Sequence, residues 1–280
     1  MPCIPGAGWI KSRADRLGVC PSKRMGQNFM TDPQFLFHIA SLAPKGTKRI
    51  LEVGPGLGSL TLPLLGRGFE VKAVELDSRL AAALPGTVKE LCPGASGDFS
   101  CIHKDALKLK PEDLGWEEEF SLVSNLPYSA AVPIILHLLS SFPALSSFLV
   151  LVQKEVGERM CAKKGGKNYG IPTLKLSWFG KAKILEKVPR TVFWPVPHVD
   201  SVLVEFKRDQ KFQDMREETF ELVDKAFNSR RKALKNSLSI EGSILEKAKI
   251  DPLLRPESLS ICDFKRIAEL SCQSGIQTAM

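Results

Sequence analysis

The segment from Arg49 to Val53 (RILEV) is a short apolar run that leads directly into Gly54, Gly56 and Gly58. Such a run, ended by glycine, predicts a buried strand. Glycines at the carboxyl end of a first strand let the backbone approach a bound cofactor closely. The spacing GxGxG differs from the GxGxxG of dinucleotide-binding enzymes. Glu52 would also repel a pyrophosphate, so the pattern favours a ligand with a cationic amino-acid group.

Strands and helices alternate along the first two thirds of the chain. This alternation predicts an α/β fold with a mostly parallel sheet covered by helices on both faces. Apart from 49–53, we predict strands at 70–76, 99–103, 120–124, 148–152, 174–179 and 201–206, and helices at 60–65, 80–91 and 134–139.

The predicted domain boundary lies near Lys207, because the chain reads as helices from about Met215 onward. Residues 1–207 are expected to form the catalytic domain, with a basic, irregular N-terminal extension over 1–25. Residues 208–280 are expected to form a helical domain that binds RNA.

The chain of 280 residues carries a formal net charge of +8, which favours a polyanionic partner, nucleic acid first and an anionic membrane surface second. No segment reaches the roughly 18 consecutive apolar residues of a membrane helix, and the N-terminus lacks a secretory signal. We therefore expect a cytoplasmic protein without a membrane partner. The seven cysteines and four histidines are scattered and contain no CxxC or HExxH, so we expect neither a disulfide framework nor a metal site.

Two acidic residues follow the glycine motif on successive predicted strands. Glu75 ends the second strand, close to the offset of about 20 residues at which an acid meets ribose hydroxyls. Asp105 follows the third strand, where its carboxylate can accept a hydrogen bond from an adenine amine. Each acid alone is typical of a solvated strand end, but glycines, Glu75 and Asp105 in this order predict a site for a nucleoside-containing cofactor.

The fourth strand ends in Asn125-Leu126-Pro127-Tyr128. The lone pair of the adenine amine is delocalised into the ring, and acceptors on its N–H groups draw the nitrogen toward sp³ character. Asn125 offers a side-chain carbonyl and Leu126 a backbone carbonyl, which Pro127 holds in extended geometry. Tyr128 can stack on the base. The alternative interpretation is a strand-ending turn with a core tyrosine.

Phe193 lies in a proline-rich segment, Val188 to Pro197. Prolines stiffen such a loop, so an exposed aromatic ring there would offer a second stacking surface for the base. A phenylalanine packed beneath the loop is equally consistent with the sequence.

These motifs together resemble the ribosomal RNA adenine dimethyltransferase family, whose loss gives bacteria kasugamycin resistance. The matching segments span Gln27 to Leu238, and their sequences are GQNF at 26–29, EVGPGLGSLT at 52–61, VELD at 74–77, DAL at 105–107, NLPY at 125–128, QKEV at 153–156 and FWPVPHVDS at 193–201. Met30 stands where the family usually has leucine, and the first twenty or so residues match nothing in the pattern.

The resemblance implies a Rossmann-like class I methyltransferase sheet of seven strands, a small helical C-terminal domain and S-adenosylmethionine as cofactor. It implies cofactor contacts by Gln27, Asn28, Met30, Gly54, Gly56, Gly58, Glu75, Leu76, Asp105, Ala106 and Asn125. It implies further that Tyr128 and Phe193 enclose the target adenine. Bacterial members of the family dimethylate two adjacent adenines in a hairpin loop of small-subunit (16S) rRNA, so the expected partner is the small ribosomal subunit and the expected state is a monomer.

Basic residues are concentrated in two segments. Between Lys154 and Arg190 the chain has ten Lys or Arg and three acids, and a second cluster lies at 230–235. The residues predicted to contact RNA are Lys163, Lys164, Lys167, Arg230, Arg231, Lys232 and Lys235. The alternative for either segment is a merely solvated surface.

Three other functions remain open at this point. The chain could be a methylase of a single adenine in large-subunit rRNA or DNA, although Leu126 disfavours the DNA enzymes, which more often have a second proline there. It could be an RNA-binding assembly factor without activity, which intact Asn125 and Tyr128 disfavour. It could be a nicotinamide dehydrogenase, which the glycine spacing disfavours.

Overall fold

The computed structural model describes residues 4–21, 28–209, 211–238, 240 and 242–273. The chain forms two compact units, of which the first contains residues 1–157 and 183–207 and the second contains 158–182 and 208–280. No helix of the described residues is long and apolar enough to cross a membrane.

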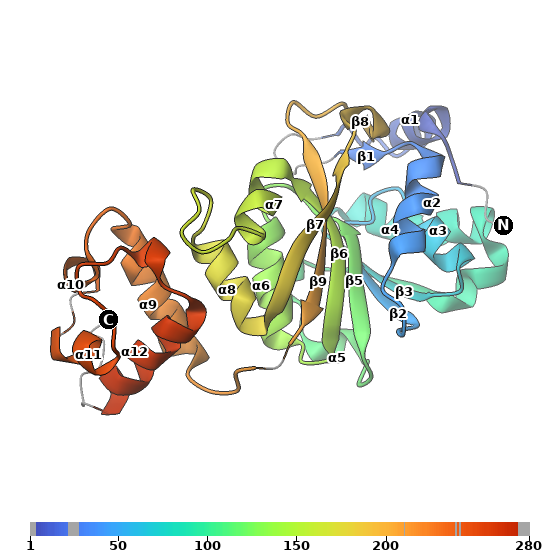
Figure 1. The fold of residues 1–280 in the computed structure, drawn as a ribbon. Helices are drawn as coiled ribbons and strands as arrows, with labels where there is room; N and C mark the ends of the chain where they lie inside the picture. The colour runs from blue at the N-terminus through green and yellow to red at the C-terminus, as the bar shows by residue number, and fades with distance from the viewer. Residues whose placement is uncertain (1–3, 22–27, 210, 239, 241, 274–280) are drawn as a thin grey trace. The chain divides into compact units, whose positions relative to one another are not determined.

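A seven-stranded sheet of order β4-β3-β2-β5-β6-β9-β7 is the centre of the fold (Figure 1). Strands β4, β3, β2, β5 and β6 are parallel, and β9 runs antiparallel to β6. This confirms the predicted α/β fold with a mostly parallel sheet. The strands of this sheet are β2 (Arg49–Val53), β3 (Glu70–Glu75), β4 (Phe99–His103), β5 (Phe120–Asn125), β6 (Leu145–Gln153), β7 (Gly180–Val188) and β9 (Ser201–Arg208).

The strands are long enough and apolar enough to be buried on both faces, as parallel strands require. In β5, Leu122 and Val123 are both fully buried although they point to opposite faces. The helices of the first unit are α1 (Ala7–Arg16), α2 (Pro33–Leu42), α3 (Thr61–Gly66), α4 (Ser78–Leu91), α5 (Pro111–Leu114) and α6 (Ala131–Ser141), and α7 (Lys154–Met160) begins in this unit and ends in the second.

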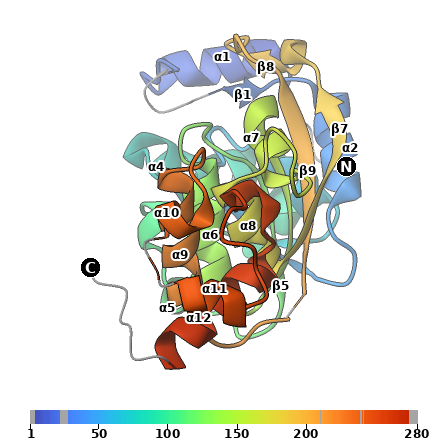
Figure 2. The same ribbon diagram turned by 60° about the vertical axis from the view of Figure 1, so that its left-hand side comes forward.

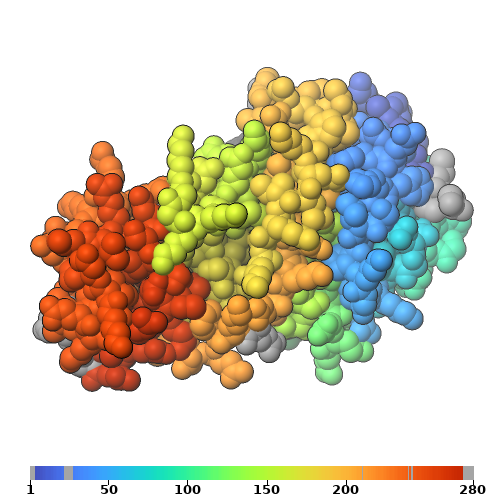
Figure 3. All heavy atoms as spheres, in the orientation of Figure 1, coloured from blue at the N-terminus to red at the C-terminus, as the bar shows by residue number. Residues whose placement is uncertain are grey.

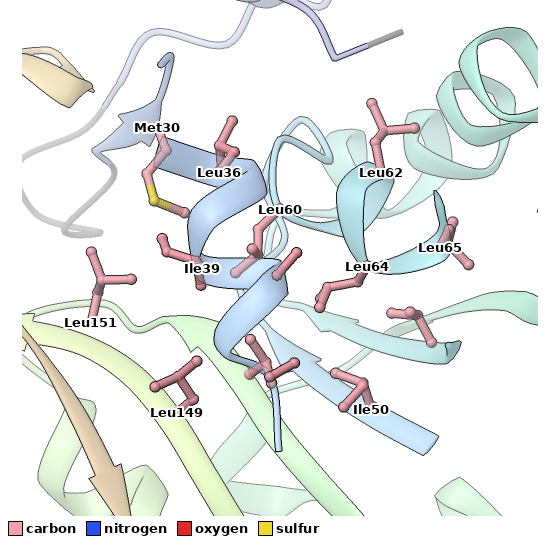
Figure 4. Packing of buried hydrophobic residues seen from close by; sticks show 14 of the residues in the cluster. Met30, Leu36, Ile39, Ile50, Leu60, Leu62, Leu64, Leu65, Leu149 and Leu151 are labelled. Carbon is pink, nitrogen blue, oxygen red and sulfur yellow. The ribbon is translucent and has the colours of Figure 1, made fainter. Parts of the chain in front are cut away.

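Helices α2 and α3 cover one face of the sheet. Figure 4 shows Ile39 of α2 and Leu64 of α3 between the helices and the strands that carry Ile50 and Leu149, in the same buried cluster as Leu36. Asp32 begins α2, as its side chain accepts hydrogen bonds from the N–H groups at 34 and 35. Burial of such side chains contributes about 1.5–3 kcal/mol each, so this layer fixes the sheet on which the site is built.

A second, small sheet pairs β1 (Phe29–Met30) with β8 (Phe193–Trp194), so that Met30 lies opposite Phe193. Strand β7 lies beside α2 on the surface of the first unit, where His38 Nε2 is 2.8 Å from Glu186 Oε1 (Figure 3).

The prediction of an irregular N-terminal extension is wrong for the residues that the structure describes. Residues Ala7–Arg16 form α1, with Ile10 and Ala14 fully buried. Gly18 adopts a left-handed conformation (φ +62°), and Val19 N–H donates to the Ala14 carbonyl at 2.9 Å. This is a Schellman ending, in which glycine is favoured because it has no Cβ. Residues 22–25 of the predicted extension lie outside the described residues.

The predicted strand at 174–179 is also wrong, because Ile171–Phe179 forms the helix α8. Leu174, Leu176 and Trp178 are buried at alternate positions, and Thr173 and Phe179 at the two ends of this run are buried as well. A helix that is buried on most of its surface has no polar stripe, so its apolar residues do not reveal the helical period.

The second unit extends beyond the predicted domain 208–280, because it also contains 158–182. Helix α8 packs against α9 and α12, which groups this segment with the C-terminal helices rather than with the sheet. The helices of this unit after residue 208 are α9 (Arg216–Asn228), α10 (Leu234–Ser237), α11 (Gly242–Lys247) and α12 (Ile261–Gln273).

Candidate cofactor and methyl-transfer site

A cavity of about 300 Å³ lies at the carboxyl ends of the parallel strands. This is the edge at which α/β sheets bind ligands, because successive loops diverge there. Most of the residues predicted to bind the cofactor line the cavity: Asn28, Met30, Gly54, Gly56, Glu75, Leu76, Asp105, Ala106 and Asn125. Gln27 lies outside the described residues.

The glycine loop approaches the cavity at two of its three glycines. A side chain at Gly56 would place its Cβ 2.8 Å from the ring of Phe29, and Gly56 has φ +58°. Gly54 also has positive φ (+70°), and both residues line the cavity. Gly58 does not line it. A Cβ at this position would lie 2.7 Å from Leu84, so the glycine lets the loop pack closely against α4. The predicted cofactor contact of Gly58 stays a prediction, since this glycine packs against α4 outside the cavity lining.

The carboxyl group of Glu75 is held by the backbone. Gly56 N–H donates to Oε2 and Asp77 N–H donates to Oε1, both at 3.0 Å. Burial raises the pKa of Glu75, and these hydrogen bonds oppose the rise. The carboxyl group is thus fixed in one orientation at the wall of the cavity.

The loop after β4 supplies the neighbouring part of the wall. Asp105 caps a single helical turn, as its Oδ1 accepts from Leu107 N–H at 2.9 Å. Leu76 and Leu107 are 58% and 42% exposed, although both side chains are apolar. Two exposed leucines beside a carboxylate suit a flat heterocycle with a polar edge.

Glu52 is the most deeply buried acid of the cavity. Its side chain is 2% exposed, and Thr61 Oγ1 donates to its Oε2 at 2.6 Å. Burial raises the pKa of Glu52 to about 8, so the folded chain retains the proton at neutral pH in the absence of a cation. A cationic group placed beside Glu52 would favour the charged carboxylate.

We expect this burial to make the chain less stable at alkaline pH. Between its ordinary value of 4.5 and about 8, Glu52 stays protonated in the folded chain but ionises in the unfolded one. Each pH unit in this window therefore lowers the free energy of unfolding by up to ~1.4 kcal/mol. Glu52→Gln removes this loss, so the variant should gain stability over the parent chain at pH 8 and little at pH 5.

Urea denaturation at both pH values, without cofactor, measures the difference. Glu112→Gln replaces an exposed acid and is the matched control. Its effect on the free energy of unfolding should be the same at pH 5 and pH 8. An equal effect of Glu52→Gln at the two pH values would contradict the prediction.

Asn125 presents a buried amide oxygen at the cavity. Its Nδ2 donates to the backbone carbonyl of Asn28 at 2.9 Å, which fixes the orientation of the amide because a carbonyl only accepts. Oδ1 is therefore the other atom of the amide, and it is buried without a hydrogen-bond partner among the described residues. An unpaired buried acceptor is costly, so such an atom marks a place where a ligand donates.

The remaining residues of the Asn125 motif are placed around this amide. Leu126 is buried and its N–H donates to the Leu151 carbonyl, whereas Pro127 lines the cavity. Tyr128 is half-buried, lies outside the cavity lining and shares a 2.7 Å hydrogen bond with Ser201 Oγ. Burial raises the pKa of Tyr128, which keeps its phenol neutral.

Phe193 does not offer a stacking surface in this structure. Its side chain is 2% exposed and belongs to the core beneath α2, opposite Met30 of β1. The pairing of β1 with β8 turns the ring inward, which is the packed alternative that the sequence left open.

Sequence reasoning missed several residues of the cavity. Ser59 lies in the glycine loop, and its Oγ is buried without a hydrogen-bond partner among the described residues. Leu107 follows directly on Asp105-Ala106, so its position next to two predicted contacts was the available signal. Lys104 also lines the cavity, but Asp113 pairs with its Nζ at 2.6 Å.

The basic residues predicted to bind RNA all lie in the second unit. The two clusters meet, because Arg230 Nη2 donates to the Lys167 carbonyl at 3.0 Å. Two of the seven are engaged in ion pairs, Arg230 with Glu257 (2.7 Å) and Lys164 with Asp263 (3.6 Å). The other five are exposed: Lys163, Lys167, Arg231, Lys232 and Lys235.

The sheet order, the glycine loop and the cavity at the strand ends define a Rossmann-like class I methyltransferase, which uses S-adenosylmethionine as methyl donor. The lining of the cavity fits this cofactor, since it combines acidic hydrogen-bond acceptors, exposed leucines and a glycine loop in which a Cβ at Gly56 would collide with Phe29. The chain belongs to the family described as ribosomal RNA adenine dimethylase, whose profile matches residues 21–271.

Curated relatives of this family match the chain over nearly its full length. Ribosomal RNA small subunit methyltransferase A of Leifsonia xyli subsp. xyli is 45% identical and covers 94% of this chain and 97% of the relative. The protein of the same name from Cutibacterium acnes is 43% identical, with 95% and 94% covered.

Two solved structures have the same fold. A dimethyladenosine transferase from Plasmodium falciparum superposes with a TM-score of 0.75 at 23% identity, covering 89% of this chain and 98% of that one. The 23S rRNA methyltransferase ErmE gives a TM-score of 0.64 at 23% identity, covering 87% and 99%. These likenesses confirm the fold that the sequence predicts.

Proposed function

We propose that this chain transfers methyl groups from S-adenosylmethionine to the N6 amines of two adjacent adenosines in a hairpin loop of small-subunit (16S) rRNA, and thereby takes part in small-subunit biogenesis. The observation that carries the proposal is the buried Asn125 Oδ1, which has no hydrogen-bond partner among the described residues and lies next to the cavity. The amine of adenine would donate the hydrogen bond that Asn125 Oδ1 does not receive from the described residues.

We propose a role for the cavity-lining residues at each end of the cofactor. Glu52 would attract the ammonium group of the methionine part, and Glu75 would accept hydrogen bonds from the ribose hydroxyls. Asp105 would accept from the adenine amine of the cofactor, with Leu76 and Leu107 against its ring. When bound, S-adenosylmethionine supplies a methyl group on a positively charged sulfur, which a nitrogen nucleophile can displace directly.

Two carbonyl oxygens of the Asn125 motif would make the target nitrogen more nucleophilic. Asn125 Oδ1 and the Leu126 carbonyl would accept the two N–H groups of the amine, which localises the nitrogen lone pair. Because Asn28 fixes the amide and Pro127 restricts Leu126, these acceptors need no reorganisation during transfer. Tyr128 would stack on the flipped base, while Ser201 orients its ring through the phenol.

The exposed basic residues of the second unit would hold the RNA backbone. Five exposed Lys and Arg side chains, Lys163, Lys167, Arg231, Lys232 and Lys235, are suited to phosphate neutralisation. We propose that a single copy of the chain acts on the small ribosomal subunit, in the cytoplasm where that subunit is assembled.

Small ribosomal subunits that lack the modification provide the direct test. We expect incubation with isotopically labelled S-adenosylmethionine, followed by RNA digestion and mass spectrometry, to show N6-dimethyladenosine at two adjacent positions. Labelled methyl groups on a single adenosine, or on large-subunit rRNA only, would contradict the proposed substrate. Absence of methylated adenosine despite measured cofactor binding would favour a role in assembly without catalysis.

A further inference from the structure

A chain of hydrogen bonds leads from Glu75 to the end of the N-terminal helix. Asp77 donates its N–H to Glu75 Oε1 at 3.0 Å, and its carboxylate accepts from both sides of the Arg79 guanidinium, at 3.1 Å from Nε and 2.8 Å from Nη2. Arg79 Nη1 in turn donates to the Gly18 carbonyl at 2.6 Å. Asp77 is buried, so the arginine that pairs with it fixes its position strongly.

The Gly18 carbonyl is placed by the way α1 ends. Gly18 N–H donates to the Asp15 carbonyl at 3.0 Å and Val19 N–H to the Ala14 carbonyl at 2.9 Å, which completes the Schellman ending. The carbonyl that Arg79 contacts therefore has a defined position only when α1 is formed.

Helix α1 is also packed against the wall of the cavity. Its Ile10 and Ala14 form a buried cluster with Phe29 and Leu80, and these last two side chains line the cavity. Figures 1 and 2 both show α1 beside β1 and β8. Arg13 joins α1 to α4, since its Nη2 donates to Thr87 Oγ1 at 3.2 Å.

These contacts concern a helix that lies before the part of the chain matched by the family profile, since the match begins at residue 21. The apolar cluster and the contact of Arg13 with Thr87 attach this helix to the rest of the unit. The polar connection through Arg79 to Asp77 ends instead on the backbone N–H that orients Glu75.

We propose that α1 and Arg79 are positioning elements of the cofactor site, which hold the Glu75 carboxylate in the orientation that binds the ribose hydroxyls. The proposal rests on the role proposed above for Glu75. It assigns a function to the N-terminal residues that the sequence pattern left without one.

The test compares the binding of S-adenosylhomocysteine with that of its 2′,3′-dideoxy analogue by calorimetry. The parent chain should bind the analogue at least roughly tenfold more weakly, because hydrogen bonds to a carboxylate are lost. In Arg79→Ala, S-adenosylhomocysteine should lose roughly tenfold while the analogue loses little, so the ratio between the ligands falls. Ile10→Asp, which disrupts the packing of α1, should reduce the ratio in the same way.

Arg67→Ala is the matched control, since Arg67 is an exposed arginine that follows α3 and lies outside this network. It should leave both affinities and the ratio unchanged, and thermal unfolding of each variant reports on the fold. If Ile10→Asp fails to fold, Arg79→Ala decides alone, because its side chain is half exposed.

Two outcomes separate the inference from its premise. A parent chain that binds both ligands equally would overturn the role of Glu75, and with it the inference. A parent chain that discriminates, together with an Arg79→Ala variant that keeps the full ratio, would overturn the positioning role while leaving that of Glu75 intact.

Discussion

We expect Asn125→Ala to transfer methyl groups about 100- to 1000-fold more slowly than the parent chain, the cost of removing one preorganised group of an active site. The variant loses the buried Oδ1 that has no hydrogen-bond partner among the described residues, and it also loses the hydrogen bond that Nδ2 donates to the Asn28 carbonyl. Single-turnover rates with saturating cofactor and RNA measure the effect without a contribution from product release.

Asn168→Ala is a suitable control, because this amide donates to Glu158 in the second unit at 3.2 Å and lies outside the cavity lining. Its rate should stay within about twofold of the parent chain, as a surface substitution usually changes little. An Asn125→Ala variant that kept its rate within tenfold would contradict the proposed role of the amide.

The second large effect concerns RNA affinity. Replacing Lys163, Lys167, Arg231 and Lys232 together by alanine removes four exposed cations from the second unit. We expect the affinity for rRNA to fall by more than about 100-fold at low salt. The slope of log K against log salt concentration should decrease by about 0.7–0.9 for each phosphate that the protein no longer neutralises.

Lys45→Ala with Lys48→Ala is the control for charge alone, since these exposed lysines precede β2 and lie at the edge of the sheet opposite the cavity. This pair should change the salt slope little, and neither variant should alter binding of S-adenosylhomocysteine. A four-residue variant with an unchanged salt slope would show that the RNA-binding residues lie elsewhere on the chain.

The cofactor half of the site could be predicted because its residues follow strand ends directly. Glu75, Asp105 and Asn125 each come at or just after the last residue of a strand, and the carboxyl ends of neighbouring parallel strands meet at one edge. Seven of the residues predicted to bind the cofactor line one cavity for this reason, because they lie at or directly after the ends of β2, β3, β4 and β5. Their contacts with the cofactor and the base stay predictions.

The errors have a common cause, since they concern properties that only tertiary packing decides. Helix α1 is short, it begins with the two small residues Ala7 and Gly8, and most of its second half is polar, although Gly18 and Val19 did carry the signal of a helix end. The orientation of Phe193 depends on pairing with Met30, which is more than 160 residues away in the sequence. For α8, burial on most sides removed the period that separates helices from strands.

The position of β2 in the sheet affects how the substrate of such a protein can evolve. Strand β2 is flanked by β3 on one side and β5 on the other, so Glu75 and Asp105 belong to one half of the sheet and Asn125 to the other. The groups proposed to hold the donor and those proposed to hold the acceptor base are therefore carried by separate loops. Mutations in the loop after β5 at positions outside the cavity lining, such as Tyr128, can alter which nucleotide is modified while donor binding is inherited unchanged, so new substrates can arise without a new cofactor site.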